Sequence, residues 1–528
     1  MGFLTTGNTT AAAAPKPQRF LINVLWNWVA VAANIFTGIV LTRYIIRKLG
    51  DERYGVWALT FTLIEYVYLF DLGFRSAIVT LVSRRRADGD IQSINEVLST
   101  AMAYFSVVAV AVVTVTMTFS EYAFRWFQVS EPFREDFSFL IRLVGFTWAI
   151  GIVASVFQAS LEASQNFRKY SHIMVVILVL RSGGLAILLY LDYGLKEMGL
   201  LVAACQCFGY LLMFITFLST YPEVRCSVHS VKVSTWREMA GFGVHSLIAS
   251  GGLLFLNQGP PVVIGHYRSE AYVGYYSVPA RLLQYIVDMV TRIGFVTVPK
   301  TAELFARGET KQIVKLGVFI NRYCLALFLP ITIFLLLYSR ELVRLWLGPT
   351  FAQQSGPLVP VLAAAITFAV AGQFNSSQLL FGMGKHRLYA RSLVVEAMAL
   401  MAGMIWVLPR HGIEGAAWVA SLLLVLNRGL TTPMLVCHYL HINYFEYMAS
   451  IYVRPVMTAL PVALAFWWLK SSGSVIGSSW TELIAVGGGC ATLFLGLCYF
   501  TCLDQEHREL FWEMLKARLP KRPVVQVL

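Results

Sequence analysis

The sequence predicts an all-α integral membrane protein with about fourteen transmembrane helices. Of its 528 residues, 57% are hydrophobic and only 13% are charged. Soluble domains carry roughly a quarter charged residues, so this deficit places the chain in lipid. Apolar runs of roughly 20 residues, enough to cross a bilayer, recur along the whole chain. The segments between them are too short to hold a soluble catalytic domain.

The predicted spans follow one another with short connections. They lie near residues 20–46, 54–75, 95–119, 137–159, 170–191, 197–219, 239–265, 270–298, 313–337, 355–381, 387–409, 413–438, 449–469 and 480–502. Residues 1–18 lack a separate short apolar stretch with a cleavage site, so we expect a retained tail and not a signal peptide.

Basic residues set the predicted orientation. If the N-terminus is cytoplasmic, the cytoplasmic segments hold twenty-two Lys and Arg residues and the opposite side holds eleven. Lys and Arg concentrate on the cytoplasmic side of membrane proteins, so both termini are predicted to be cytoplasmic. The net charge of +13 is explained by the same bias, and we expect no nucleic-acid partner.

A short pattern occurs twice along the chain. Residues 54–57 and 71–75 of span 2 are echoed by residues 274–276 and 288–292 of span 8. Spans 2 and 8 are six apart, which predicts two six-helix lobes in the same orientation, with a substrate site between them. The predicted organisation is a tail at 1–18, a first lobe at 19–219, a cytoplasmic linker at 220–237, a second lobe at 238–440, two further helices within 441–502, and a cytoplasmic tail at 503–528.

Four arginines lie deep inside apolar spans, and they indicate an anionic cargo. They are Arg181, Arg281, Arg322 and Arg428. A cation at bilayer depth costs several kcal/mol, and guanidinium does not lose its proton to avoid that cost. Such groups therefore line a wet cavity or pair with an acid on another helix, and both interpretations stay open. The arginines nearer span ends can extend to the interface instead; these are Arg43, Arg142, Arg391 and Arg454.

Span 8 carries a polar face. Arg281, Gln284, Asp288 and Arg292 follow at spacings of three, four and four, which places them on one side of a helix. Arg281 has no acid one turn away, so we expect it to contact cargo, with Gln284 beside it. Asp288 can pair with Arg292 as a purely structural ion pair.

Carboxylates inside spans are candidates for ion coupling, because such a group can hold a proton or bind sodium. Glu65 and Glu396 lie deep, while Asp71 and Asp288 lie near the predicted cytoplasmic ends of their spans. Pairing with an arginine is the alternative for each. The eight cysteines form no CxxC unit or zinc-like cluster, so no metal and no cofactor is expected beyond a coupling H⁺ or Na⁺.

Span 7 contains two amides directly before two prolines. Asn257 and Gln258 precede Pro260 and Pro261, and consecutive prolines are expected to kink or break the helix. Broken helices at this depth often border a transport site, where these amides could bind sugar hydroxyls. A hinge that makes no cargo contact is the alternative interpretation.

Several short motifs together resemble a known family. Residues 49–50, 54–57 and 71–73, then 274–282, then 345–348, are similar to the polysaccharide transporters of the multidrug/oligosaccharidyl-lipid/polysaccharide (MOP) flippase superfamily. The resemblance implies a MATE-like fold of two lobes that rock about a central cavity.

The resemblance also implies a function. It indicates a bacterial inner-membrane flippase that moves a polyprenyl-pyrophosphate-linked oligosaccharide to the outer leaflet for O-antigen, capsule or exopolysaccharide synthesis. Membrane lipid, a polysaccharide polymerase and a chain-length regulator are the other partners it implies. Guanidinium matches phosphate geometry, which suits the deep arginines.

Two other functions stay open. A drug or cation antiporter of the same fold would carry more cavity acids than bases, whereas deep arginines outnumber deep acids here. A membrane-embedded polymerase or ligase would need a long external loop for sugar chemistry, and the sequence shows none. The sequence contains no GxxxxGK[ST] motif, which would indicate ATP-driven transport, and no HExxH or GxSxG motif, which would indicate a hydrolase.

Overall fold

The computed structural model of the chain describes residues 35–66, 74–164, 167–295, 297–370, 375–472, 477–504 and 508–509. All regular structure within these ranges is helical. Eight of the described helices are long and apolar enough to cross a bilayer, and α13 is a shorter apolar helix. In lipid every backbone N–H and C=O must be satisfied internally, which is why these apolar runs form helices.

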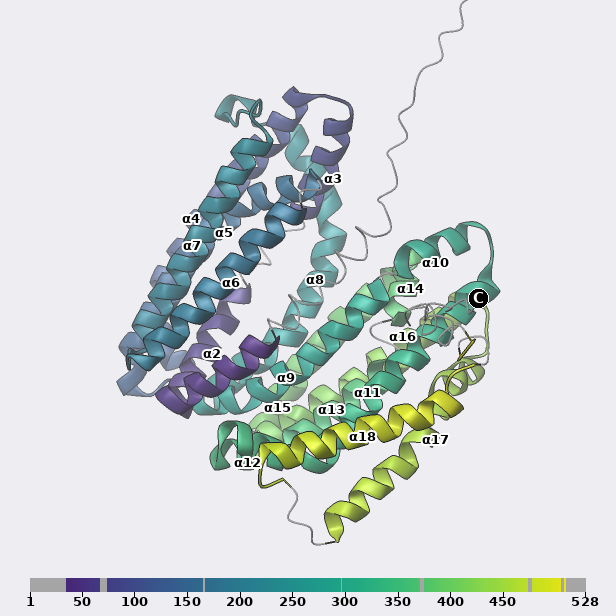
Figure 1. Cartoon of the computed structure of the whole chain (residues 1–528). Coiled ribbons are helices and arrows are strands. Elements are labelled where there is room, and N and C mark those ends of the chain that lie inside the picture. Colours follow the sequence, from purple (N-terminus) through teal and green to yellow (C-terminus); the bar gives the residue numbers. More distant parts are fainter. Residues whose placement is uncertain are drawn as a thin grey trace, which may run out of the picture.

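The helices form two bundles that diverge from a shared contact (Figure 1). The first bundle contains a helix at residues 35–49, α2 (Asp51–Glu65), α3 (Phe74–Ala87), α4 (Ile91–Trp126), α5 (Arg134–Ala163), α6 (Phe167–Tyr190) and α7 (Leu195–Thr220), with short 3-10 turns η2 (Glu131–Phe133) and η3 (Val228–Ser230) at its edges.

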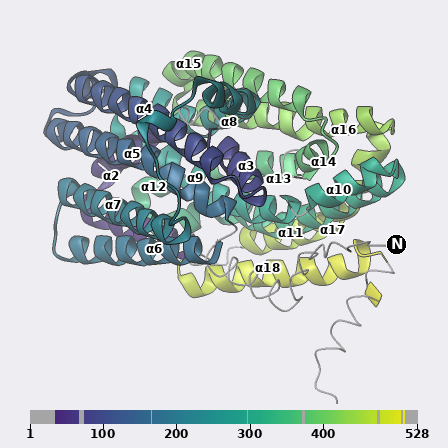
Figure 2. The same cartoon turned by 90° about the horizontal axis from the view of Figure 1, so that it is seen from above.

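The second bundle contains the remaining elements. They are α8 (Val233–Tyr267), α9 (Glu270–Phe295), α10 (Thr297–Ala306), α11 (Thr310–Leu347), α12 (Pro349–Gln354), α13 (Leu358–Val370), α14 (Ser377–Gly382), α15 (Arg387–Leu424), a π-helical turn η5 (Val425–Thr431), α16 (Thr432–Leu440), α17 (Tyr444–Ser471) and α18 (Trp480–Thr501). Figure 2 shows the same two groups from above, with α18 lying along one side.

Local chemistry fixes several helix boundaries. The carboxylate of Asp90 caps α4 by accepting from the Ser93 backbone N–H. Asn443 and Ser479 cap α17 and α18 in the same way. Within α15, Gly412 has φ 61° and ψ −157°, a conformation that glycine tolerates at no steric cost. This kink separates the predicted spans 387–409 and 413–438.

The predicted break in span 7 is not observed. Pro260 and Pro261 lie inside α8, which runs from Val233 to Tyr267 as one helix. Both prolines are buried, and α8 packs along α15. Packing against its neighbours evidently compensates for the two backbone donors that the prolines remove.

The two lobes meet where α2 and α9 begin. A Cβ atom placed on Gly55 of α2 would lie 1.9 Å from the carbonyl oxygen of Glu270, so only glycine fits this approach. Gly274 of α9 faces Gly55 in turn, because its Cβ would lie 3.7 Å from the Gly55 Cα. The two glycines of the repeated pattern thus pack on each other across the lobes.

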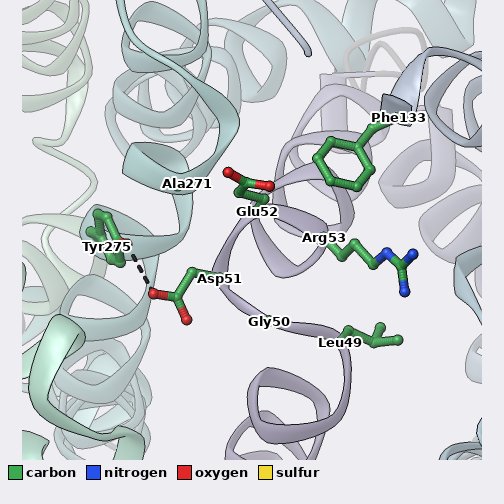
Figure 3. Close-up of a pocket in the computed structure, with 8 residues that line it drawn as sticks. All are labelled: Leu49, Gly50, Asp51, Glu52, Arg53, Phe133, Ala271 and Tyr275. Atoms are coloured by element: carbon green, nitrogen blue, oxygen red, sulfur yellow. Dashed lines mark hydrogen bonds between the residues drawn. The ribbon is translucent and has the colours of Figure 1, made fainter. Parts of the chain in front are cut away.

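Polar contacts reinforce this junction. The Tyr275 hydroxyl donates to Asp51 Oδ2 over 2.9 Å, as Figure 3 shows, and the Ser130 hydroxyl donates to Glu270 Oε1 over 2.7 Å. Both bonds join the first lobe to the second. A hollow of about 470 Å³ lies at the same place. Its lining consists of Leu49, Gly50, Asp51, Glu52, Arg53, Phe133, Ala271 and Tyr275.

From this junction the bundles diverge toward the ends that carry α3 and α10 (Figure 1). The basic residues of those two helices include Arg84, Arg85, Arg86 and Lys300. In the predicted orientation this is the cytoplasmic side, so the lobes are joined at the outer end and apart at the inner end.

We predict that Gly55→Ala weakens the junction between the lobes. The new methyl would overlap the Glu270 carbonyl, and overpacking of this kind costs about 1–3 kcal/mol. A cysteine introduced as Ala271→Cys, which lines the hollow, should then react at least about fivefold faster with a membrane-impermeant maleimide added from outside.

The matched control is Gly183→Ala on α6, because a Cβ there meets nothing within 4 Å. Equal labelling rates in the Gly55→Ala chain and the parent would contradict the role of this contact.

Candidate functional site

The polar face predicted for α9 is partly exposed. Arg281 and Asp288 are exposed and Gln284 is half-buried. Gln284 Nε2 donates to Asp288 Oδ1 over 2.8 Å, so these two side chains are partners one turn apart. The side chain of Arg292, the alternative partner of Asp288, lies outside the described residues.

A second group of side chains crosses between the lobes. Glu65, at the end of α2, accepts a hydrogen bond from the amide of Gln258 on α8. Glu65 also interacts electrostatically with Arg281 of α9. A half-buried acid of the first lobe therefore faces an amide and a guanidinium of the second.

Tyr285 connects the two deep arginines of this region. It interacts electrostatically with both Arg281 and Arg181, the latter on α6 of the first lobe. Its hydroxyl lies against the backbone of Gly38, where a Cβ would approach to 2.1 Å. The sequence analysis missed Tyr285, although its position four residues after Arg281 on the same helical face could have indicated it.

We call Glu65, Arg181, Gln258, Arg281 and Tyr285 the central cluster. Its members come from α2 and α6 of the first lobe and from α8 and α9 of the second. Among the residues that the structure describes, neither Arg181 nor Arg281 has a carboxylate oxygen within 4 Å. Within the cluster two guanidiniums and one acid are half-buried to exposed, and Asp288, a second acid, also interacts electrostatically with Tyr285.

Asn257 is exposed next to this cluster, one residue before Gln258. An exposed amide can donate and accept at the same time, as sugar hydroxyls require. Asp71, the remaining acid predicted for ion coupling, lies outside the described residues.

Arg428 is paired inside the second lobe. Its guanidinium and the carboxylate of Glu396 on α15 approach to 3.0 Å, with side chains 7% and 3% exposed. Asn427 also donates to Glu396 Oε2, over 2.7 Å. Arg428 had been predicted to contact cargo and Glu396 to couple an ion. The structure pairs them with each other instead, which is the alternative that the sequence left open.

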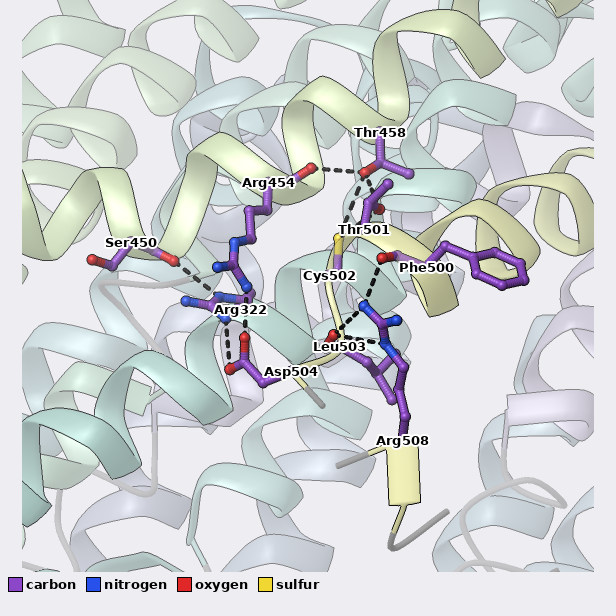
Figure 4. Close-up of polar contacts among 10 residues, drawn as sticks. All are labelled: Arg322, Ser450, Arg454, Thr458, Phe500, Thr501, Cys502, Leu503, Asp504 and Arg508. Atoms are coloured by element: carbon purple, nitrogen blue, oxygen red, sulfur yellow. Dashed lines mark hydrogen bonds and ion pairs between the residues drawn. The ribbon is translucent and has the colours of Figure 1, made fainter. Parts of the chain in front are cut away.

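Arg322 is also paired, away from the central cluster. Its Nη1 lies 3.2 Å from Asp504 Oδ2, and its Nε donates to the Ser450 carbonyl over 2.9 Å. Arg454 of α17 reaches the other oxygen of Asp504 at 2.6 Å (Figure 4). Asp504 follows the end of α18, in a segment that the sequence analysis had assigned to a tail.

The described residues contain no group of three or more His, Cys, Asp or Glu side chains that could hold a metal ion. Two of the deep arginines, Arg322 and Arg428, are instead paired with Asp504 and Glu396. Of the four deep arginines, Arg181 and Arg281 therefore remain as the cations of the central cluster.

Comparisons with known proteins identify the family of the chain. The sequence model of a family described as polysaccharide biosynthesis proteins matches residues 44–356. The chain is 21% identical over 418 residues to a Shigella flexneri protein assigned as an O-antigen transporter, covering 77% of this chain and 95% of that one. It is 19% identical over 508 residues to the uncharacterised membrane protein EpsK of Bacillus subtilis, covering 93% and 97%.

Solved structures show the same fold. The lipid II flippase MurJ in an inward closed conformation matches with a TM-score of 0.69 at 11% identity, over 90% of this chain and all of that one. An inward-facing MATE-family multidrug transporter of the MOP superfamily matches with a TM-score of 0.62 at 14% identity, over 76% and 94%. The predicted helical fold of this superfamily is confirmed.

We predict that Glu396→Gln destabilises the protein by about 3–5 kcal/mol, because it leaves the Arg428 guanidinium buried without a counter-charge. Thermal unfolding of the purified protein in detergent measures the effect. Glu414→Gln, an exposed acid on the same helix, serves as the control.

The double variant Glu396→Leu, Arg428→Leu should recover most of this loss, since it removes both charges. If Glu396→Gln unfolds at the temperature of the parent, the pair does not contribute to stability as described.

Proposed function

This chain belongs to the polysaccharide biosynthesis protein family and has the MOP-superfamily fold, and we propose that it flips a polyprenyl-pyrophosphate-linked oligosaccharide across the bacterial inner membrane. The observation that supports this most is the cationic central cluster between the lobes. A pyrophosphate in a low-dielectric setting needs cations, and guanidinium provides paired donors in the geometry of phosphate oxygens.

We assign the charged and the neutral polar side chains of this region to different parts of the cargo. Arg181 and Arg281 are assigned to the pyrophosphate, because neither has an ion-pair partner among the described residues. Asn257, which is exposed on α8, and Gln284 are assigned to sugar hydroxyls. Arg322 and Arg428 are assigned a structural role, because each is held by a carboxylate.

Glu65 is the residue we assign to coupling. In the absence of cargo its carboxylate faces Arg281 and accepts from Gln258. An arriving pyrophosphate competes with Glu65 for Arg281, and protonation of Glu65 removes that competition. A proton taken up by Glu65 therefore favours cargo at Arg281, and its release favours the cargo-free state.

The residue chemistry argues against the other two functions. A cationic drug would meet the Arg181 and Arg281 guanidiniums at close range, and like charges repel most where water is scarce. A polymerase or ligase would need a long external segment for sugar chemistry, and the predicted connections between spans are short.

We predict that Arg281→Ala and Arg181→Ala each lower flipping at least about tenfold, since each removes charge-assisted hydrogen bonds to phosphate. Proteoliposomes with a fluorescent polyprenyl-pyrophosphate oligosaccharide in the inner leaflet report its arrival outside. Arg142→Ala, which removes an exposed arginine of α5, is the matched control.

Unchanged flipping in both variants would contradict a cationic cargo site. Efflux of a cationic dye faster than that of the glycolipid would favour the antiporter, and elongation of the glycan would favour the polymerase.

We further predict that a proton gradient, acidic on the side from which the glycolipid is loaded, speeds flipping by the parent but not by Glu65→Gln, whose amide carries no proton to exchange. Stimulation of the parent by a sodium gradient alone would show that sodium, not a proton, is the coupling ion. If Glu65→Gln responds to the proton gradient as the parent does, Glu65 is not the coupling residue.

A further inference from the structure

A second concentration of arginines lies at the end of α18, away from the central cluster. Asp504 accepts from Arg322 Nη1 over 3.2 Å and from Arg454 Nη1 over 2.6 Å. Four residues on, Arg508 folds back and donates to the carbonyls of Phe500 and Leu503 over 2.8 Å and 3.0 Å. Figure 4 shows the three guanidiniums gathered around this turn. We call Arg322, Arg454, Asp504 and Arg508 the α18 arginine cluster.

The cluster has more positive than negative charge. Within the described residues, Asp504 is the carboxylate that contacts Arg322 and Arg454, so two guanidiniums share one acid. Arg508 is bonded to carbonyl oxygens, which carry no charge to offset its own. Three guanidiniums and one carboxylate of this cluster therefore lie where α11, α17 and α18 pack together.

Arg454 and Asp504 are the exposed members of the cluster. Their side chains are 52% and 48% exposed, while that of Arg322 is 10% exposed and closes the inner side of the cluster. A guanidinium has five N–H donors in a planar fork. The bond between Arg454 and Asp504 uses Nη1, one of the three nitrogens of a side chain that is 52% exposed.

Exposed apolar side chains lie next to Arg454 along α17. Val453 and Met457 are 54% and 63% exposed. In a helix that spans a bilayer, exposed side chains of this kind contact acyl chains. The ligand must therefore bring an anionic head to Arg454 and hydrocarbon to its neighbours.

We propose that the α18 arginine cluster binds the phosphate of an anionic phospholipid, with Arg454 as its main contact. The cluster lies at the end of the chain predicted to be cytoplasmic, the leaflet side on which basic pockets between helices bind such headgroups. Asp504 bonds both Arg322 and Arg454 and so positions their guanidiniums. Its negative charge also competes with the phosphate for these arginines.

The test uses the full-length protein, purified in detergent and stripped of lipid. Phosphatidylglycerol or phosphatidylcholine is added, and the melting temperature and the lipids retained in native mass spectrometry are recorded. Phosphatidylglycerol should raise the melting temperature of the parent more than phosphatidylcholine does. Arg454→Ala should abolish that difference and weaken phosphatidylglycerol retention at least about tenfold.

Two variants separate binding from general damage to the fold. Arg454→Lys keeps the charge but loses the planar fork, so it should retain phosphatidylglycerol with intermediate affinity. Asp504→Asn removes the competing carboxylate and should increase retention of phosphatidylglycerol. Arg391→Ala, which deletes an exposed arginine of α15, should leave the lipid preference unchanged.

Equal stabilisation of the parent by both lipids, or an unchanged preference in Arg454→Ala, would overturn the proposal. A third arm adds undecaprenyl pyrophosphate. If it is retained at this cluster and phosphatidylglycerol is not, the occupant is a pyrophosphate lipid and the assignment to phospholipid is wrong.

Discussion

The cost of a fixed cation at bilayer depth is the constraint on which this molecule depends. Guanidinium keeps its charge, so each deep arginine requires either a carboxylate or a hydrated surface. Arg428 takes Glu396, and Arg322 takes Asp504. Arg181 and Arg281 instead lie between the lobes, where both interact electrostatically with Tyr285 and Arg281 also interacts with Glu65. We therefore assign a structural role to the two paired arginines and, under the proposed function, cargo contact to the other two.

A second constraint is the close approach of two backbones at the junction of the lobes. Gly55 and Gly274 allow α2 and α9 to touch where any side chain would collide. At the same end, Asp51 accepts a hydrogen bond from Tyr275 and Glu270 accepts one from Ser130. Each of these bonds links residues of different lobes. These bonds are polar, while buried apolar residues of both lobes, such as Leu59 and Val273, belong to one hydrophobic cluster.

Composition and apolar periodicity were enough to predict the fold class, because lipid leaves the backbone few alternatives to a helix. The same reasoning found the central residues Arg281, Gln258 and Glu65, whose charge or polarity is anomalous in an apolar run. It could not choose between cargo contact and pairing for Arg428, because Glu396 lies 32 residues away in sequence. Nor could it find Asp504 as a partner of Arg322, 182 residues distant. Such pairings depend on tertiary packing.

The central cluster is assembled from both halves of the molecule, and this has a consequence for release. Glu65 and Arg181 belong to the first lobe, while Gln258, Arg281 and Tyr285 belong to the second. Any motion that separates the lobes at this depth pulls the two guanidiniums apart. An anion held by both would then keep only half of its ligands. Under the proposed function, the affinity for the anion therefore falls when the lobes separate, and this separation itself favours release of the cargo.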